Sequence, residues 1–112
     1  MRYLGYTLAS EADIPSEPPP PELYETMGTF VEEAVNAGVI VATGGIAPTS
    51  EGAKVSLQDG EFTVVDGPFT EAKELVGGWA LMECRDMDEA IEWTKRFLSV
   101  LGAGECRVRP VT

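Results

Sequence analysis

The chain has 112 residues, with 19 acidic and 8 basic side chains and a formal net charge of −11. Its length and its 44% content of hydrophobic residues predict a single globular domain over residues 1–112. The negative charge opposes binding to nucleic acid or to an anionic membrane, and the apolar runs are too short to span a bilayer.

The chain contains no histidine and only two cysteines, Cys84 and Cys106. The commonest metal ligand and the commonest general base near neutral pH are therefore missing, and two thiols alone do not make a zinc site. We expect no metal and no cofactor. Both cysteines lie in apolar runs, which is typical of buried, reduced thiols. The first residues alternate like a strand instead of forming a signal peptide, so we expect a cytoplasmic protein.

The N-terminal third predicts a strand, a stiff loop and a helix. Residues 3–9 alternate and are rich in aromatic and β-branched types, which favours a strand. Residues 10–21 contain five prolines and form an extended connector. Pro21 suits the first turn of a helix, and Gly38 suits its end. Apolar residues follow at helical spacing and predict one buried stripe: Leu23, Met27, Phe30, Val31 and Ala34.

The middle of the chain predicts a strand followed by a hairpin. Residues 39–43 are mostly β-branched and read as a strand, which Gly44-Gly45 is expected to break or bulge. Residues 53–58 and 61–65 flank Asp59-Gly60, and two such runs around Asp-Gly give the strongest short signal for a β-hairpin.

The C-terminal part predicts a strand over 77–84, a helix from the N-cap Asp86 to about residue 100, and a strand over 105–111. The order is then β-α-β, hairpin, β-α-β, which predicts an α+β fold: a ferredoxin-like sandwich with an inserted β-hairpin. Trp79, Leu81 and Val41 are candidates for the sheet face that the helices leave open. Since large exposed apolar faces are rare on monomers, we predict a two-fold homodimer.

Asp66 opens the most distinctive stretch, Asp66-Gly67-Pro68-Phe69, at the end of a predicted strand. In the turn, Gly67 is expected to supply a positive φ and Pro68 a fixed one. A carboxylate at the mouth of a cleft can act as a catalytic base or accept a hydrogen bond from a ligand. The alternative is an Asx-turn residue that bonds the backbone two residues on.

Four further residues are candidates for ligand binding. Glu71 and Lys73 are two residues apart, so on an extended segment they share a face and can hold a polar ligand or shift the pKa of Asp66. An exposed ion pair is the alternative. Tyr6 and Trp79 can line an apolar pocket, with core or dimer-interface packing as the alternative.

The run from Val65 to Trp79, Val-Asp-Gly-Pro-Phe-Thr-Glu-Ala-Lys-Glu-Leu-Val-Gly-Gly-Trp, resembles the YCII-related proteins of the DGPF-domain group. The flanking segments agree over nearly the whole chain. The resemblance implies a dimeric α+β barrel, in line with the strand order. In the broader superfamily a His–Asp pair has been proposed as an active site, which a chain without histidine does not supply.

Three functions follow as hypotheses. The first is a ligand-binding or regulatory homodimer with a small-molecule pocket near the Asp-Gly-Pro-Phe motif. The second is a cofactor-independent enzyme of the isomerase or lyase type that uses Asp66 as acid or base, which requires a pocket that reaches this residue. The third is a protein-interaction module with the Pro-rich loop 10–21 as its handle.

Overall fold

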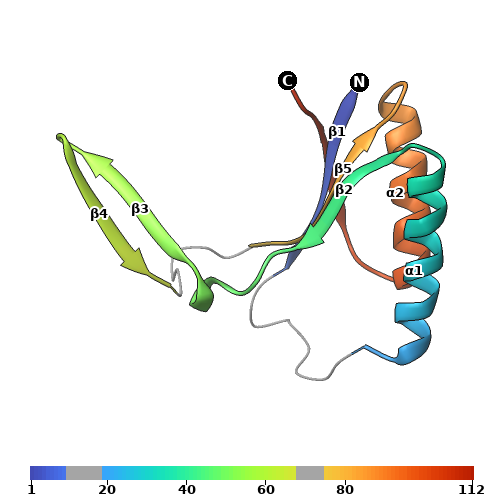
Figure 1. Ribbon diagram of the computed structural model, residues 1–112, viewed down its shortest axis with the longest axis horizontal. Helices are drawn as coiled ribbons and strands as arrows, with labels where there is room; N and C mark the ends of the chain where they lie inside the picture. The colour runs from blue at the N-terminus through green and yellow to red at the C-terminus, as the bar shows by residue number, and fades with distance from the viewer. Residues whose placement is uncertain (10–18, 68–74) are drawn as a thin grey trace.

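The computed structural model describes residues 1–9, 19–67 and 75–112 (Figure 1). Its elements, in chain order, are β1 (Arg2–Ala9), α1 (Pro21–Asn36), β2 (Ile40–Gly45), the short 3₁₀ helix η2 (Thr49–Glu51), β3 (Ala53–Gln58), β4 (Glu61–Asp66), β5 (Leu75–Glu83), α2 (Met87–Leu101) and β6 (Cys106–Pro110). The chain is therefore α+β, as the sequence predicts.

Four of the described strands form an antiparallel sheet in the order β2-β5-β1-β6. Helices α1 and α2 lie on one face of this sheet (Figure 1). Each helix connects two strands that are not neighbours in the sheet, so the arrangement is compatible with a ferredoxin-like sandwich.

Pleat alternation divides the side chains of the sheet between two faces. Tyr3 and Met82 are cross-strand partners and lie on the helix side, where both are buried. The opposite face, which we call the open face, carries the residues that alternate with them: Arg2, Leu4, Tyr6, Leu8, Ala42, Gly44, Trp79, Leu81, Glu83, Arg107 and Arg109. Val41, by contrast, lies where the register of β2 shifts between Ile40 and Ala42.

The expected break at Gly44-Gly45 is wrong, because both glycines belong to β2. Gly44 pairs with Trp79, and a Cβ built on Gly44 would lie 3.3 Å from the indole ring. A side chain at this position would press on the tryptophan. The glycine therefore makes room for a large ring on the neighbouring strand instead of ending the strand.

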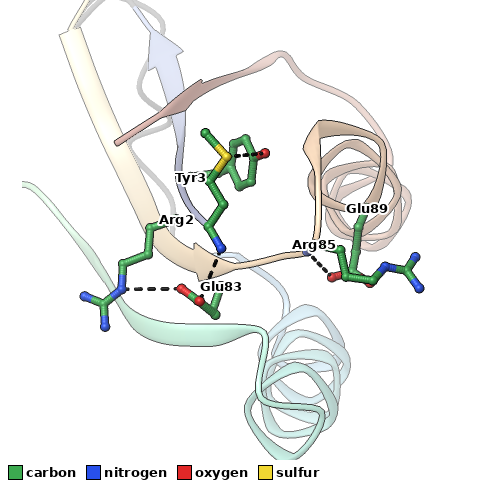
Figure 2. A network of polar contacts seen from close by, with 6 residues as sticks. Arg2, Tyr3, Glu83, Arg85 and Glu89 are labelled. Carbon is green, nitrogen blue, oxygen red and sulfur yellow. Dashed lines mark hydrogen bonds and ion pairs between the residues drawn. The ribbon is translucent and has the colours of Figure 1, made fainter. Parts of the chain in front are cut away.

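Both helices begin and end with the residues that the sequence predicts. Pro21 is the first residue of α1, and Gly38 follows its end with φ of 77°. Asp86 caps α2 by accepting a hydrogen bond of 2.9 Å from the Glu89 N–H. The Glu89 carboxylate accepts from the Arg85 N–H, one residue before the cap, so the capping box is displaced by one position (Figure 2).

The fully packed part of the core lies at one end of the sandwich. Tyr3 at the start of β1 packs with residues from the start of β2, the end of β5 and the first turn of α2: Val39, Met82, Cys84 and Ala90. The Tyr3 hydroxyl donates to Met1 Sδ at 3.3 Å (Figure 2).

Exposed ion pairs form at the same end of the sheet. Glu83 pairs with Arg2 at 3.4 Å and with the Met1 amino group at 3.3 Å (Figure 2). These ion pairs are exposed and each stabilises the fold by less than about 1 kcal/mol.

Strands β3 and β4 form a separate two-stranded sheet between β2 and β5 in the sequence. This hairpin, which we call the arm (residues 53–66), projects from the body on the side of the sheet opposite the helices (Figure 1). Its turn residues Asp59 and Gly60 have φ of 53° and 80°. Positive φ at both positions is the pattern of a type I′ turn, which explains why Asp-Gly stands here.

Candidate functional site

A cavity of about 190 Å³ lies between the helix side of the sheet and the two helices. Strand residues and the inward-facing side chains of α1 and α2 line it. The helices contribute mainly apolar and aromatic side chains: Met27, Phe30, Val31, Ala34, Trp93, Thr94 and Phe97. The strands contribute smaller or apolar residues, among them Gly5, Thr7, Val39, Thr43, Gly78, Ala80, Met82 and Cys106.

An aromatic cluster forms the helix wall of the cavity. The Phe30 ring lies 6.1 Å from the Trp93 ring and 6.3 Å from the Phe97 ring, measured between centroids, and both pairs are tilted. Such pairs stabilise by about 0.5–1.5 kcal/mol beyond their burial. The Arg96 guanidinium covers this cluster from outside, 4.4 Å from the Trp93 centroid, and pairs with Glu33 of α1 at 2.6 Å. The wall is therefore held together across both helices.

The polar groups that border the cavity are largely satisfied by the backbone. The Thr7 hydroxyl oxygen accepts from the Gly78 N–H at 2.8 Å. The Thr43 hydroxyl donates to the Trp79 carbonyl at 2.8 Å, and the Thr94 hydroxyl donates to the Ala90 carbonyl at 2.8 Å. Burial raises the pKa of the Cys106 thiol, which therefore stays neutral at pH 7. The cavity thus offers shape and apolar surface, not charge.

Tyr6 and Trp79, two of the predicted ligand-binding residues, are cross-strand partners on β1 and β5 and both border this cavity. Strand alternation, however, assigns their side chains to the open face, together with Leu4 and Leu81. The two residues therefore lie together, but on the sheet face for which dimer-interface packing was the alternative to ligand binding.

Asp66 is the last residue of β4, at the base of the arm, where it is exposed and pairs with Ala53. It is not among the described residues that border the cavity. The structure therefore does not bring Asp66 together with Tyr6 and Trp79, and its catalytic role stays a prediction.

Gly67, the next residue of the motif, has a structural role. The Gly67 N–H donates to the Gly52 carbonyl at 3.0 Å, and a Cβ built on Gly67 would overlap the Thr49 carbonyl oxygen. Its φ is not positive, so the expected reason for this glycine is wrong. The glycine is needed because the backbone passes directly against η2, which fixes the base of the arm.

The other two predicted binding residues, Glu71 and Lys73, lie outside the described residues, as does most of the Pro-rich segment at 10–18. Within the described ranges, no cluster of three or more Cys, Asp or Glu side chains is arranged to hold a metal ion. Neither α1 nor α2, the helices of the described part, has the length and apolar character needed to cross a bilayer.

Sequence reasoning missed the residues whose side chains form the cavity walls. Phe30 follows helical spacing in the first predicted helix, which is typical of ordinary core, and Trp93 is not part of a predicted apolar stripe. A weaker signal was available in the sheet, where Gly5, Gly78 and Ala80 leave the helix side without large side chains. Bulky residues on the helices that face small residues on the sheet can either collapse together or leave a hollow, and this pattern does not decide between the two.

The family model for the YCII-related domain matches residues 1–112, the whole chain. The chain belongs to the YCII-related family. An uncharacterised protein from Rhizobium meliloti (strain 1021) is 33% identical over 78 residues. The match covers 69% of this chain and 63% of that relative, so the chain matches less than two thirds of the relative's length. Membership in the YCII-related family agrees with the α+β fold and leaves the function to the site.

Proposed function

We propose that this YCII-related protein is a ligand-binding or regulatory protein that holds a small, mostly apolar molecule in the cavity between its sheet and its helices. The observation that carries the proposal is a cavity of about 190 Å³ with an aromatic wall and polar groups already bonded to the backbone. A cavity of about 150 Å³ lined by apolar side chains stays dry and binds benzene. The volume here therefore fits a single-ring or short-chain molecule.

The position of the cavity supports the proposal that it holds a ligand. The packed core around Tyr3 and Cys84 lies at one end of the sandwich, and the cavity extends along the sheet from two other members of this core, Val39 and Met82. A ligand in this place adds apolar contacts to Phe30, Trp93 and the sheet at once, and so stabilises the docking of both helices. The free thiols Cys84 and Cys106 agree with a cytoplasmic protein.

We also propose that the protein works as a homodimer, with the open face covered by a second copy. The large apolar residues of that face, Leu4, Tyr6, Leu8, Trp79 and Leu81, are only half-buried in the single chain. Face-to-face packing of two such sheets gives the α+β barrel that the family resemblance implies. It leaves the cavity, on the other side of each sheet, in place.

Thermal unfolding in the presence of small apolar probes tests the ligand proposal. For toluene we expect a dissociation constant of about 0.1–1 mM, given the few atoms involved. At ten times that concentration the ligand adds about 1.4 kcal/mol of stability, which raises Tm by about 5 °C.

Two matched variants locate the binding. Ala80→Leu places a larger side chain in the cavity from β5 and should abolish the Tm shift, whereas Ala42→Leu makes the same change on the open face and should preserve it. If no single-ring or short-chain probe raises Tm, or if Ala80→Leu responds as the unaltered protein does, the proposed site is wrong.

A further inference from the structure

We propose that the arm, residues 53–66, binds a second copy of this chain that packs on the open face. The first observation is the register of the hairpin. Val55 pairs with Val64 and Leu57 pairs with Phe62, so all four large apolar side chains lie on one face of the arm. The other face carries Lys54, Ser56, Gln58, Glu61, Thr63 and Val65.

The apolar face of the arm is uncovered in the single chain. Val55, Leu57, Phe62 and Val64 are 62–73% exposed. A two-stranded hairpin is at best marginally stable alone in water, and apolar patches of this kind mark interaction sites. The arm therefore needs a surface to cover this face, and the described body of its own chain does not provide it, because the arm projects away from that body (Figure 1).

The direction of the arm indicates where the covering surface lies. The arm extends on the side of the sheet opposite the helices, which is the side of the open face (Figure 1). A molecule seated on the open face is thus flanked by the arm. The half-buried centre of that face and the apolar face of the arm together provide the kind of surface that an interface of about 800 Å² per partner requires.

Charge favours a second copy of the same chain as the occupant. The chain carries −11 overall, yet its open face carries Arg2, Arg107 and Arg109 against Glu83 and the neighbouring Glu105, which pairs with Arg107 at 3.4 Å. The arm carries Asp59, Glu61 and Asp66 against Lys54 alone. The arm of one copy and the open face of another are therefore opposite in sign, while the overall charge opposes nucleic acid and anionic membranes. A two-fold axis gives each copy the same arm contact.

The inference rests on the proposed dimer and adds the arm as a separate part of its interface. The test compares dimer dissociation constants by analytical ultracentrifugation of the full chain. One variant replaces the apolar face with β-branched polar residues that keep strand propensity: Val55→Thr, Leu57→Thr, Phe62→Thr and Val64→Thr. The matched control exchanges two residues on the opposite face of the same hairpin, Ser56→Thr and Thr63→Ser.

We expect the four-residue variant to raise the dissociation constant about a hundredfold or more, and the control to change it less than about threefold. Equal dissociation constants for the four-residue variant and the unaltered protein would overturn the role of the arm while leaving the dimer in place. A monomeric unaltered protein at about 100 μM would overturn the arm and the proposed dimer together. Circular dichroism confirms that the body of each variant is folded.

A second measurement uses the unaltered protein and does not depend on how the variants fold. Amide hydrogen exchange in β3 and β4 is recorded above and below the dimer dissociation midpoint. The proposal predicts that protection of these amides is lost on dilution. Protection that does not change with concentration would mean that the arm packs on its own chain, and would overturn the proposal.

Discussion

Replacing Phe30 by alanine tests the helix wall of the cavity. Phe30 is 8% exposed, and its ring contacts both Trp93 and Phe97 of α2. Its removal takes away about 2 kcal/mol of transfer free energy. It also enlarges the hollow by the volume of a ring, roughly 90 Å³, which at about 24 cal/mol per Å³ adds about 2 kcal/mol.

We therefore expect Phe30→Ala to lower the free energy of unfolding by about 4 kcal/mol, a large part of the 5–15 kcal/mol typical of a domain. Phe30→Leu keeps most of the side-chain volume and should lower the free energy of unfolding by about 1.5 kcal/mol. Tyr24→Ala on the same helix is the control, because Tyr24 is 62% exposed and its loss should change stability by less than about 0.5 kcal/mol.

Urea unfolding at fixed protein concentration, followed by circular dichroism, measures all three variants. A loss in the free energy of unfolding below about 1 kcal/mol for Phe30→Ala, or a loss no larger than that of Tyr24→Ala, would contradict this expectation. Either result would mean that the ring is not enclosed between the helices, and the cavity would then lack its wall.

Three shorter predictions test other parts of the structure. Gly67→Ala should lower the free energy of unfolding by about 2 kcal/mol or more, because the added Cβ would overlap the Thr49 carbonyl oxygen. Hydrogen exchange should show loss of protection at the amide of residue 67. Unchanged protection would contradict the close approach of the two backbones. In urea unfolding, Asp86→Ala should lower the free energy of unfolding by about 1 kcal/mol. Asp86→Asn should lower it much less, because asparagine can also accept the hydrogen bond from the Glu89 N–H. Equal losses for the two variants would argue against the helix cap. Burial raises the pKa of Tyr3 and of Cys84, so the folded state holds their protons more tightly than the unfolded state. The contribution of these two groups to the free energy of unfolding should be fully present below their pKa values in the unfolded state. It should be lost as the pH rises from those values to the higher pKa values of the folded state. Tyr3→Phe should make this loss of stability at alkaline pH smaller.

Local signals in the sequence predicted most of the secondary structure. Pro21, Gly38 and Asp86 mark helix ends for steric and hydrogen-bonding reasons that act within a few residues, and all three stand where expected. Asp59-Gly60 fixed the hairpin turn in the same way, because both positions need positive φ. Such features need no knowledge of the rest of the fold.

Features that depend on contacts distant in the sequence were not predictable. Gly44 stays within β2 because the Trp79 ring lies over it, and Gly67 is required because η2 passes beside it. Both reasons involve residues far away along the chain or in another element. The same holds for the cavity, since the spacing of Phe30 predicts ordinary core until the small residues on the sheet are known.

Two of the predicted ligand-binding residues border the cavity, and their role in binding a ligand stays a prediction. Tyr6 and Trp79 do border the cavity, but alternation assigns their side chains to the open face, and a period of two does not tell which face the helices cover. Asp66 stands at a strand end, as predicted, yet that strand belongs to the arm and not to the main sheet.

A titration with toluene, followed by amide chemical shifts in two-dimensional NMR, tests the ligand site directly. We expect saturable shifts centred on Phe30, Trp93, Thr94 and Ala80, with the arm unaffected, and loss of these shifts in Ala80→Leu. Shifts confined to the open face, or the absence of saturable shifts up to the aqueous solubility limit of toluene, would contradict a ligand site between the sheet and the helices.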